Sequence, residues 1–167
     1  MTTTRFWRAT AFLIVVFALS TQGLAQPATP KAEGVIDDYS AAAGGPWHVV
    51  GEWSLSVRGD SGKVDFVAAL IMTRSDSETR SPHTHHIYLT DAIATPLANG
   101  YRISGPSATI TSNGALAPFS GTPLEVEISG GSAVPFANVK VTFSGAAADH
   151  FGADPIDGVV TRVTPPR

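Results

Sequence analysis

The chain has 167 residues, of which 43% are hydrophobic and 15% are charged, and its formal net charge at pH 7 is −3. Mild acidity without a run of basic residues argues against nucleic acid or an anionic membrane surface as a partner. The absence of cysteine excludes a disulfide framework, so the folded chain depends on its core alone, as is common in a bacterial periplasm.

The first 25 residues have the features of a secretory signal peptide. Arg5 and Arg8 precede an apolar run over residues 11–19, and residues 23–25 (Gly-Leu-Ala) form a small-x-small cleavage site. The run is shorter than the roughly 20 apolar residues of a membrane span, which disfavours the alternative of a retained anchor. Cleavage after Ala25 predicts a secreted or periplasmic protein. Removing two of the 11 basic residues leaves nine against 14 acidic ones, a net charge of −5.

The next segment, residues 26–46, is rich in Pro, Ala and Gly. This composition predicts a lead segment with little structure at its start, although Val35, Ile36 and Tyr39 can pack against the rest of the chain. Residues 47–167 are then expected to form a single domain, because domains commonly hold roughly 100 to 150 residues.

Two strands joined by a turn are predicted over residues 47–58 and 63–73, because apolar side chains alternate with polar ones in both. The sequence Gly-Asp-Ser-Gly between them is typical of a turn. Placing Arg58 opposite Lys63 brings both apolar faces to one side. The pairs that follow are Leu55 with Phe66, Trp53 with Ala68, and Gly51 with Leu70. Large side chains then meet small ones, and a slip of one residue would separate the apolar faces.

Six further strands are expected at short intervals, and no stretch after the signal peptide has the 3.6-residue periodicity of a helix. Their expected bounds are His85–Asp91, Tyr101–Ser104, Ala108–Ser112, Leu124–Ser129, Asn138–Ser144 and Gly158–Val163. About eight antiparallel strands without helices must close on themselves or stack to bury their apolar faces. The predicted fold is therefore all-β, a single antiparallel barrel or sandwich.

The second predicted strand departs from clean alternation. Val67, Ala69 and Ile71 make its outer face apolar as well. Such a face needs a cover, which predicts either that the Pro/Ala-rich lead segment lies over it or that a second copy of the chain does. A homo-oligomer is one of these two expectations.

The segment His83-Thr84-His85-His86 is the sharpest chemical feature of the sequence. If Ile87 points to the core, His83 and His85 share its face, and two imidazoles at i and i+2 on a strand suit a divalent transition metal such as Zn or Cu. The third ligand expected first is His150, with Glu52, Asp65 and Asp149 as alternatives, and the spacing does not select among them. The strand register places His48 at the same end of the sheet, on the opposite face with His86.

A hydrogen-bonded histidine cluster without a metal is the competing interpretation of this segment. For the segment Asp149-His150-Phe151-Gly152, the competing interpretation is a loop in which Phe151 anchors the chain to the core and Gly152 permits a reversal. The H-x-H tripeptide also occurs in cupins. Thr90 and Asp91 stand where a cupin has its Glu, and the second cupin motif is missing.

Gly51-Glu52-Trp53 resembles the G-x-W motif of lipocalins, in which the Trp closes one end of an eight-stranded barrel that holds an apolar ligand. The resemblance covers these three residues and Arg162, which would stack over the Trp. It implies a barrel with a cavity. The candidate ligand-binding residues are Trp53, Phe66 and Tyr88, and the alternative is that the aromatic residues of the inner face are ordinary core.

Three functions are compatible with these patterns. The first is an exported binding protein with a transition-metal site at the histidines. The second is a carrier of a small apolar molecule inside the barrel, and the third is a barrel enzyme of cyclase or isomerase type. The chain lacks the G-x-S-x-G, P-loop and H-E-x-x-H motifs and has no cysteine nucleophile, so the sequence favours binding over catalysis.

Overall fold

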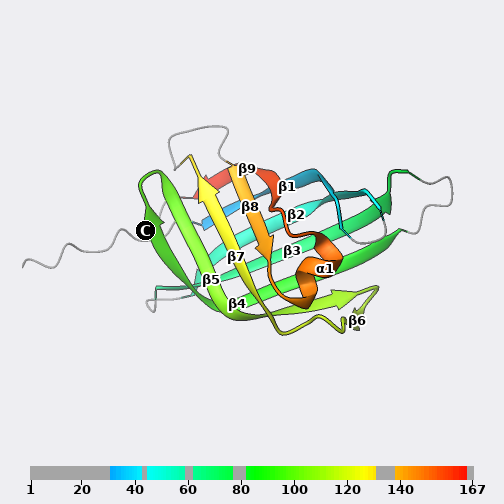
Figure 1. Cartoon of the computed structure of the whole chain (residues 1–167). Coiled ribbons are helices and arrows are strands. Elements are labelled where there is room, and N and C mark those ends of the chain that lie inside the picture. The colour runs from blue at the N-terminus through cyan, green and yellow to red at the C-terminus, as the bar shows by residue number, and fades with distance from the viewer. Residues whose placement is uncertain (1–30, 43–44, 59–61, 77–81, 131–137, 165–167) are drawn as a thin grey trace, which may run out of the picture.

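The computed structural model describes residues 31–42, 45–58, 62–76, 82–130 and 138–164, and these form nine strands and one short helix (Figure 1). The strands are β1 (Lys31–Ser40), β2 (Trp47–Arg58), β3 (Lys63–Arg74), β4 (His83–Leu97), β5 (Gly100–Ser112), β6 (Ala115–Leu116), β7 (Thr122–Ser129), β8 (Asn138–Phe143) and β9 (Ile156–Thr164). The helix, α1 (Ala146–Phe151), lies between β8 and β9.

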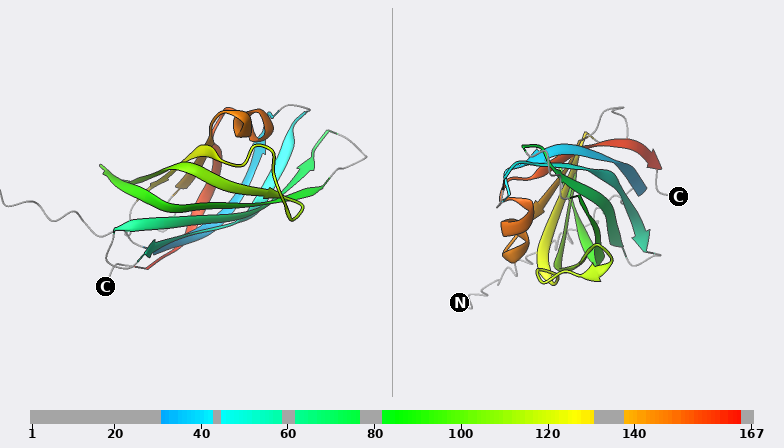
Figure 2. Two further views of the ribbon diagram at one scale, coloured as in Figure 1. Left: turned by 90° about the horizontal axis from the view of Figure 1, so that it is seen from below. Right: turned by 90° about the vertical axis from the view of Figure 1, so that its right-hand side faces the viewer.

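Eight of the strands form a closed antiparallel barrel, which confirms the all-β prediction and selects a barrel over a sandwich. Each strand pairs with the next along the chain, except that β5 pairs with β7 past the two-residue strand β6, and β9 returns to pair with β1. The end-on view in Figure 2 shows the strands surrounding one interior. Closure removes the exposed edges that an open sheet would leave.

The register between β2 and β3 is the predicted one. Leu55 lies opposite Phe66, Trp53 opposite Ala68, and Gly51 opposite Leu70. The apolar face of β3 points into the barrel, with Phe66 0% and Leu70 1% exposed. The period of two in the sequence therefore fixes which side chains enter the core.

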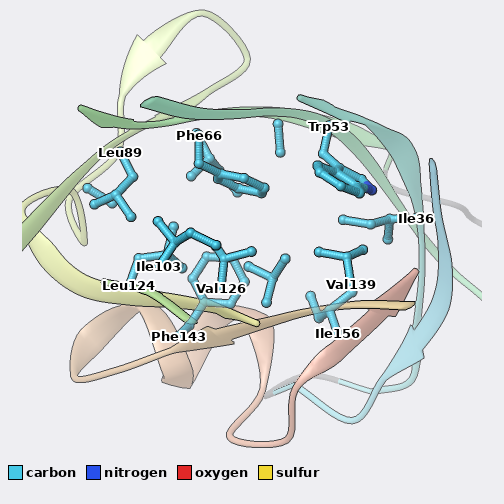
Figure 3. Packing of buried hydrophobic residues seen from close by; sticks show 14 of the residues in the cluster. Ile36, Trp53, Phe66, Leu89, Ile103, Leu124, Val126, Val139, Phe143 and Ile156 are labelled. Carbon is cyan, nitrogen blue, oxygen red and sulfur yellow. The ribbon is translucent and has the colours of Figure 1, made fainter. Parts of the chain in front are cut away.

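Side chains from all around the barrel fill its interior (Figure 3). Trp53 and Phe66 stack with their ring centroids 6.0 Å apart, and both are almost fully buried. The other labelled members of this core are Ile36, Leu89, Ile103, Leu124, Val126, Val139, Phe143 and Ile156. The core thus draws on strands from β1 to β9.

Strand β1 differs from the expected lead segment, since the barrel begins at Lys31 and not at Trp47. Ala32 and Ile36 alternate inward along β1, but Gly, Asp and Ser residues disguise this period in the sequence. At Gly34 the chain passes so close to β9 that a Cβ atom would lie 1.9 Å from the Val159 carbonyl oxygen. Glycine at this position therefore permits the closing pair.

Other elements also differ from the prediction. Strand β4 runs from His83 to Leu97 and is longer than the expected His85–Asp91. The strands expected over 101–104 and 108–112 are one strand, β5, which continues through Gly105 and Pro106 with a register shift against β7. A bulge tolerates a proline because the extra residue donates no ladder hydrogen bond. Helix α1 was not expected, because six residues are too few to show a helical period.

The outer apolar face of β3 remains partly open to solvent in the single chain. Ile71 is 46% exposed, and Val35 on β1, beyond the intervening strand β2, is 39% exposed. The described part of the lead segment forms β1, which pairs edge to edge with β2. It does not cover the outer face of β3, so the first of the two expectations is wrong for these residues. The other expectation, a homo-oligomer, stays a prediction.

Within the described residues, no helix has the length and apolar character to cross a membrane. The predicted signal peptide, residues 1–25, lies outside the described residues. Its role, and the export of the protein that it implies, stay predictions.

The β3 register predicts very different effects for two substitutions in one strand. Phe66→Ala should lower the free energy of unfolding by about 3–5 kcal/mol, because it removes a fully buried ring from a packed core. Ile71→Ala, on the outer face, should change it by less than about 1 kcal/mol. Urea unfolding measures both. Equal losses at the two positions would contradict the inward orientation of Phe66.

Candidate metal centre

Strand β4 holds two of the candidate ligands on its inner face. His85 is fully buried and His83 is half-buried, whereas Thr84 and His86 point outward and are exposed. Pairing with β3 sets this orientation, because His85 lies opposite Leu70, and His83 lies opposite Met72. The prediction that His83 and His85 share one face is therefore confirmed.

Helix α1 brings the third candidate, His150, to the same end of the barrel (Figure 1). Phe151 anchors the helix, since its buried ring stacks on Phe143 at a centroid distance of 4.0 Å. The buried Ser40 hydroxyl donates a hydrogen bond to the Phe151 carbonyl oxygen. Gly152 then ends the helix with a φ of 101°, which favours glycine. The anchoring role expected of Phe151 is correct, although the segment is a helix rather than a loop.

The three imidazoles meet at their Nε2 atoms. His150 Nε2 lies 2.9 Å from His85 Nε2 and 3.3 Å from His83 Nε2. One nitrogen from each histidine lies within 4.8 Å of the other two. Ligands at 2.0–2.1 Å from a tetrahedral zinc ion are about 3.3–3.4 Å apart, so small movements would fit this cluster to an ion.

A backbone hydrogen bond fixes the orientation of His85. Its Nδ1 donates to the Thr111 carbonyl oxygen at 3.0 Å, which leaves Nε2 with its lone pair toward the cluster. The pKa of His85 is lowered to about 4, chiefly by burial and in part by the neighbouring imidazoles of His150 and His83, while the hydrogen bond to Thr111 opposes the shift. Burial also lowers the pKa of His150. The deeper part of the cluster is therefore uncharged at neutral pH.

Aromatic rings surround the histidines. Phe119 stacks on His150 at a centroid distance of 4.5 Å, and Trp47 meets His83 edge-on at 5.0 Å. Phe151 packs against His85 at 4.8 Å. The sequence pattern did not point to Phe119, because it lies in the turn segment between β6 and β7 and only the closed barrel brings it to His150.

The carboxylates considered as third ligands do not join the cluster. Glu52 is exposed on the outer face of β2, and Asp149 is exposed on α1. Asp65 pairs with Arg58 and accepts the Asp91 backbone N–H, and these contacts lower its pKa. Among the described residues, the group of possible ligands at this end consists of the three histidines.

The remaining histidines lie on the outer surface, as the register predicts. His48 Nε2 is 2.6 Å from Asp37 Oδ1, and the His48 ring stacks on Tyr39. His86 is exposed beside Tyr88. Neither histidine belongs to the inner cluster.

The proposed ligand-binding residues do not line one site. Trp53 and Phe66 stack within the core, whereas Tyr88 points outward and is 39% exposed. Arg162 is exposed and pairs with Glu33 on the outer surface, so it does not stack over Trp53 as the lipocalin resemblance implies.

A groove of about 380 Å³ crosses the outer face of β1, β2 and β3, away from the histidines.

Comparisons with known proteins give no family. The chain matches no protein-family model, no curated protein and no solved structure. The function must therefore be argued from the geometry of the site.

The buried, neutral state of His85 predicts a pH-dependent stability for the metal-free protein. Because its pKa of about 4 in the fold is below the ordinary 6.5, the unfolded chain binds a proton between these values and the folded chain does not. Its contribution to stability is complete above pH 6.5 and is lost as the pH falls toward 4. From pH 7.5 to 5 this loss should be about 2 kcal/mol.

Urea unfolding in the presence of a chelator measures this dependence. His85→Gln, which keeps an amide donor for the Thr111 carbonyl but does not titrate, should reduce the difference between the two pH values. An unchanged difference in the variant would show that His85 does not titrate as described.

Proposed function

We propose that the protein is an exported β-barrel that binds a divalent transition metal ion, Zn²⁺ or Cu²⁺, through His83, His85 and His150. The observation that supports this proposal is the convergence of three Nε2 atoms from β4 and α1 on one point. Two strand residues and a helix residue are held there by barrel pairing, the Phe151 anchor and the Ser40 hydrogen bond.

The donor set favours these ions over magnesium or calcium. Imidazole nitrogen suits Zn, Cu, Fe and Ni, whereas Mg²⁺ and Ca²⁺ prefer oxygen ligands. The hydrogen bond from His85 Nδ1 to the Thr111 carbonyl is the kind of outer-shell contact that orients histidine ligands in metal sites. Uncharged imidazoles are also the form that binds metal.

The directions of the imidazole nitrogens also agree with a metal site. With Nδ1 of His85 donating to the Thr111 carbonyl oxygen, its Nε2 is an acceptor whose lone pair faces His150 Nε2. A metal ion accepts all three lone pairs at once. The pairwise distances therefore agree with a ligand tripod.

Export supports the same proposal from the sequence. The predicted signal peptide would direct the chain out of the cytoplasm. The absence of cysteine excludes thiolate ligands. Secretion or periplasmic location remains part of the proposal, and N-terminal sequencing of the exported protein tests cleavage after Ala25.

Metal binding should raise the melting temperature of the protein. At a free Zn²⁺ concentration 100 times Kd, the added stability is about 2.7 kcal/mol, which corresponds to a rise on the order of 5–10 °C. The test uses protein purified without a His tag, analysed for bound metal and then titrated with Zn²⁺ and Cu²⁺ during thermal unfolding.

Matched variants separate the cluster from the surface histidines. The double variant His83→Ala/His85→Ala should lose the metal-induced rise, whereas His86→Ala on the outer face of the same strand should keep it. The proposal would be refuted if the purified protein holds no metal and if neither Zn²⁺ nor Cu²⁺ changes its melting temperature.

A further inference from the structure

The histidine cluster provides three donors, whereas zinc binds four ligands. Among the described residues, no carboxylate belongs to the group formed by His83, His85 and His150. Structural zinc sites are closed by four protein ligands, while three protein ligands with water in the fourth position are typical of catalytic sites. If the proposed function holds, the described ligands leave one coordination position, which a molecule from solution would take.

The three imidazole ligands do not neutralise any of the charge of the bound ion. Carboxylate or thiolate ligands would cancel part of the charge of a divalent ion, but imidazole is neutral when it binds. The described acidic residue closest in sequence, Asp149, is exposed and lies outside the ligand group. A divalent ion held by three neutral nitrogens strongly acidifies bound water, which can then ionise near pH 7.

The position of the cluster leaves two of its histidines partly exposed to solvent. His85 lies in the core, but His83 and His150 are only half-buried, so the cluster spans the boundary between core and solvent. Trp47 and Phe119, both half-buried, place aromatic rings against these two histidines. Flat apolar groups pack well against such rings.

We propose that the centre, loaded with Zn²⁺, activates water and hydrolyses small neutral carboxylic esters, with a preference for those that carry an aromatic group. The hydroxide formed from the bound water attacks the ester carbonyl carbon, and a new carbon–oxygen bond forms. The bond to the alkoxy group breaks, and the alcohol leaves with the proton of the attacking hydroxide, so that the acid remains as carboxylate. A second water replaces the carboxylate product and releases one proton to the solvent. This inference rests on the proposed metal binding.

The test measures hydrolysis of p-nitrophenyl acetate by the Zn²⁺-loaded and the metal-free protein. The loaded protein should exceed an equal concentration of free Zn²⁺ by roughly tenfold or more, with a rate that rises through an ionisation near pH 7. His150→Ala should remove this excess, whereas His86→Ala should retain it. Phenyl acetate should be preferred to ethyl acetate after correction for their rates with free hydroxide.

Spectroscopy of the Co²⁺-loaded protein tests the open position without relying on turnover. Azide should shift the visible absorption bands of the bound ion, because it takes the fourth position. A spectrum that azide does not change would overturn the inference.

Calorimetric titration with Zn²⁺ on the same samples separates the two proposals. Zn²⁺ binding without hydrolysis above the free ion would overturn the esterase inference and leave metal binding intact. If Zn²⁺ does not bind, the esterase inference fails, and the proposed metal binding fails with it only if Cu²⁺ does not bind either. Hydrolysis that survives in a His150→Ala variant that no longer binds Zn²⁺ would place the activity elsewhere and also overturn the inference.

Discussion

The pairing of β1 with β9 is the contact on which the rest of the structure depends. It closes the sheet into a barrel and turns β8 and α1 toward the inner face of β4. His150 and His85 are 65 residues apart in the chain, yet their Nε2 atoms lie 2.9 Å apart because of this curvature. The β1–β9 pair also requires glycine at position 34, because a Cβ atom there would collide with the Val159 carbonyl oxygen. The site is therefore a product of closure and not of any one segment.

Closure also explains the electrostatics of the cluster. The ring of His85 lies among Phe151, Phe119 and the other two imidazoles, so protonation would place a charge where little water can solvate it. The Thr111 carbonyl satisfies one ring nitrogen and leaves the other directed at its neighbours. Burial thus keeps the histidine in the form that binds a metal, while the half-buried His83 and His150 connect the centre to solvent.

The sequence predicts the parts of this arrangement that depend on local period. The β2–β3 register and the shared face of His83 and His85 follow from alternation and from matching large side chains to small ones. The choice of His150 over the carboxylates could not be decided, because it depends on the distant β1–β9 contact. Strand β1 was missed since its polar and glycine residues hide the period. Helix α1 is too short to have one.

The same geometry bears on the alternative of an enzyme that works by acid–base catalysis alone. A general base is most effective when its pKa lies near the working pH, and the pKa of His85, about 4, is far below neutrality. Burial shifts His150 in the same direction. Such imidazoles are weak proton acceptors at pH 7, but their lone pairs are available to a metal ion without competition from protons. The core position that makes His85 a poor base therefore makes it a good ligand, and this favours metal chemistry over a cyclase or isomerase that relies on side chains only.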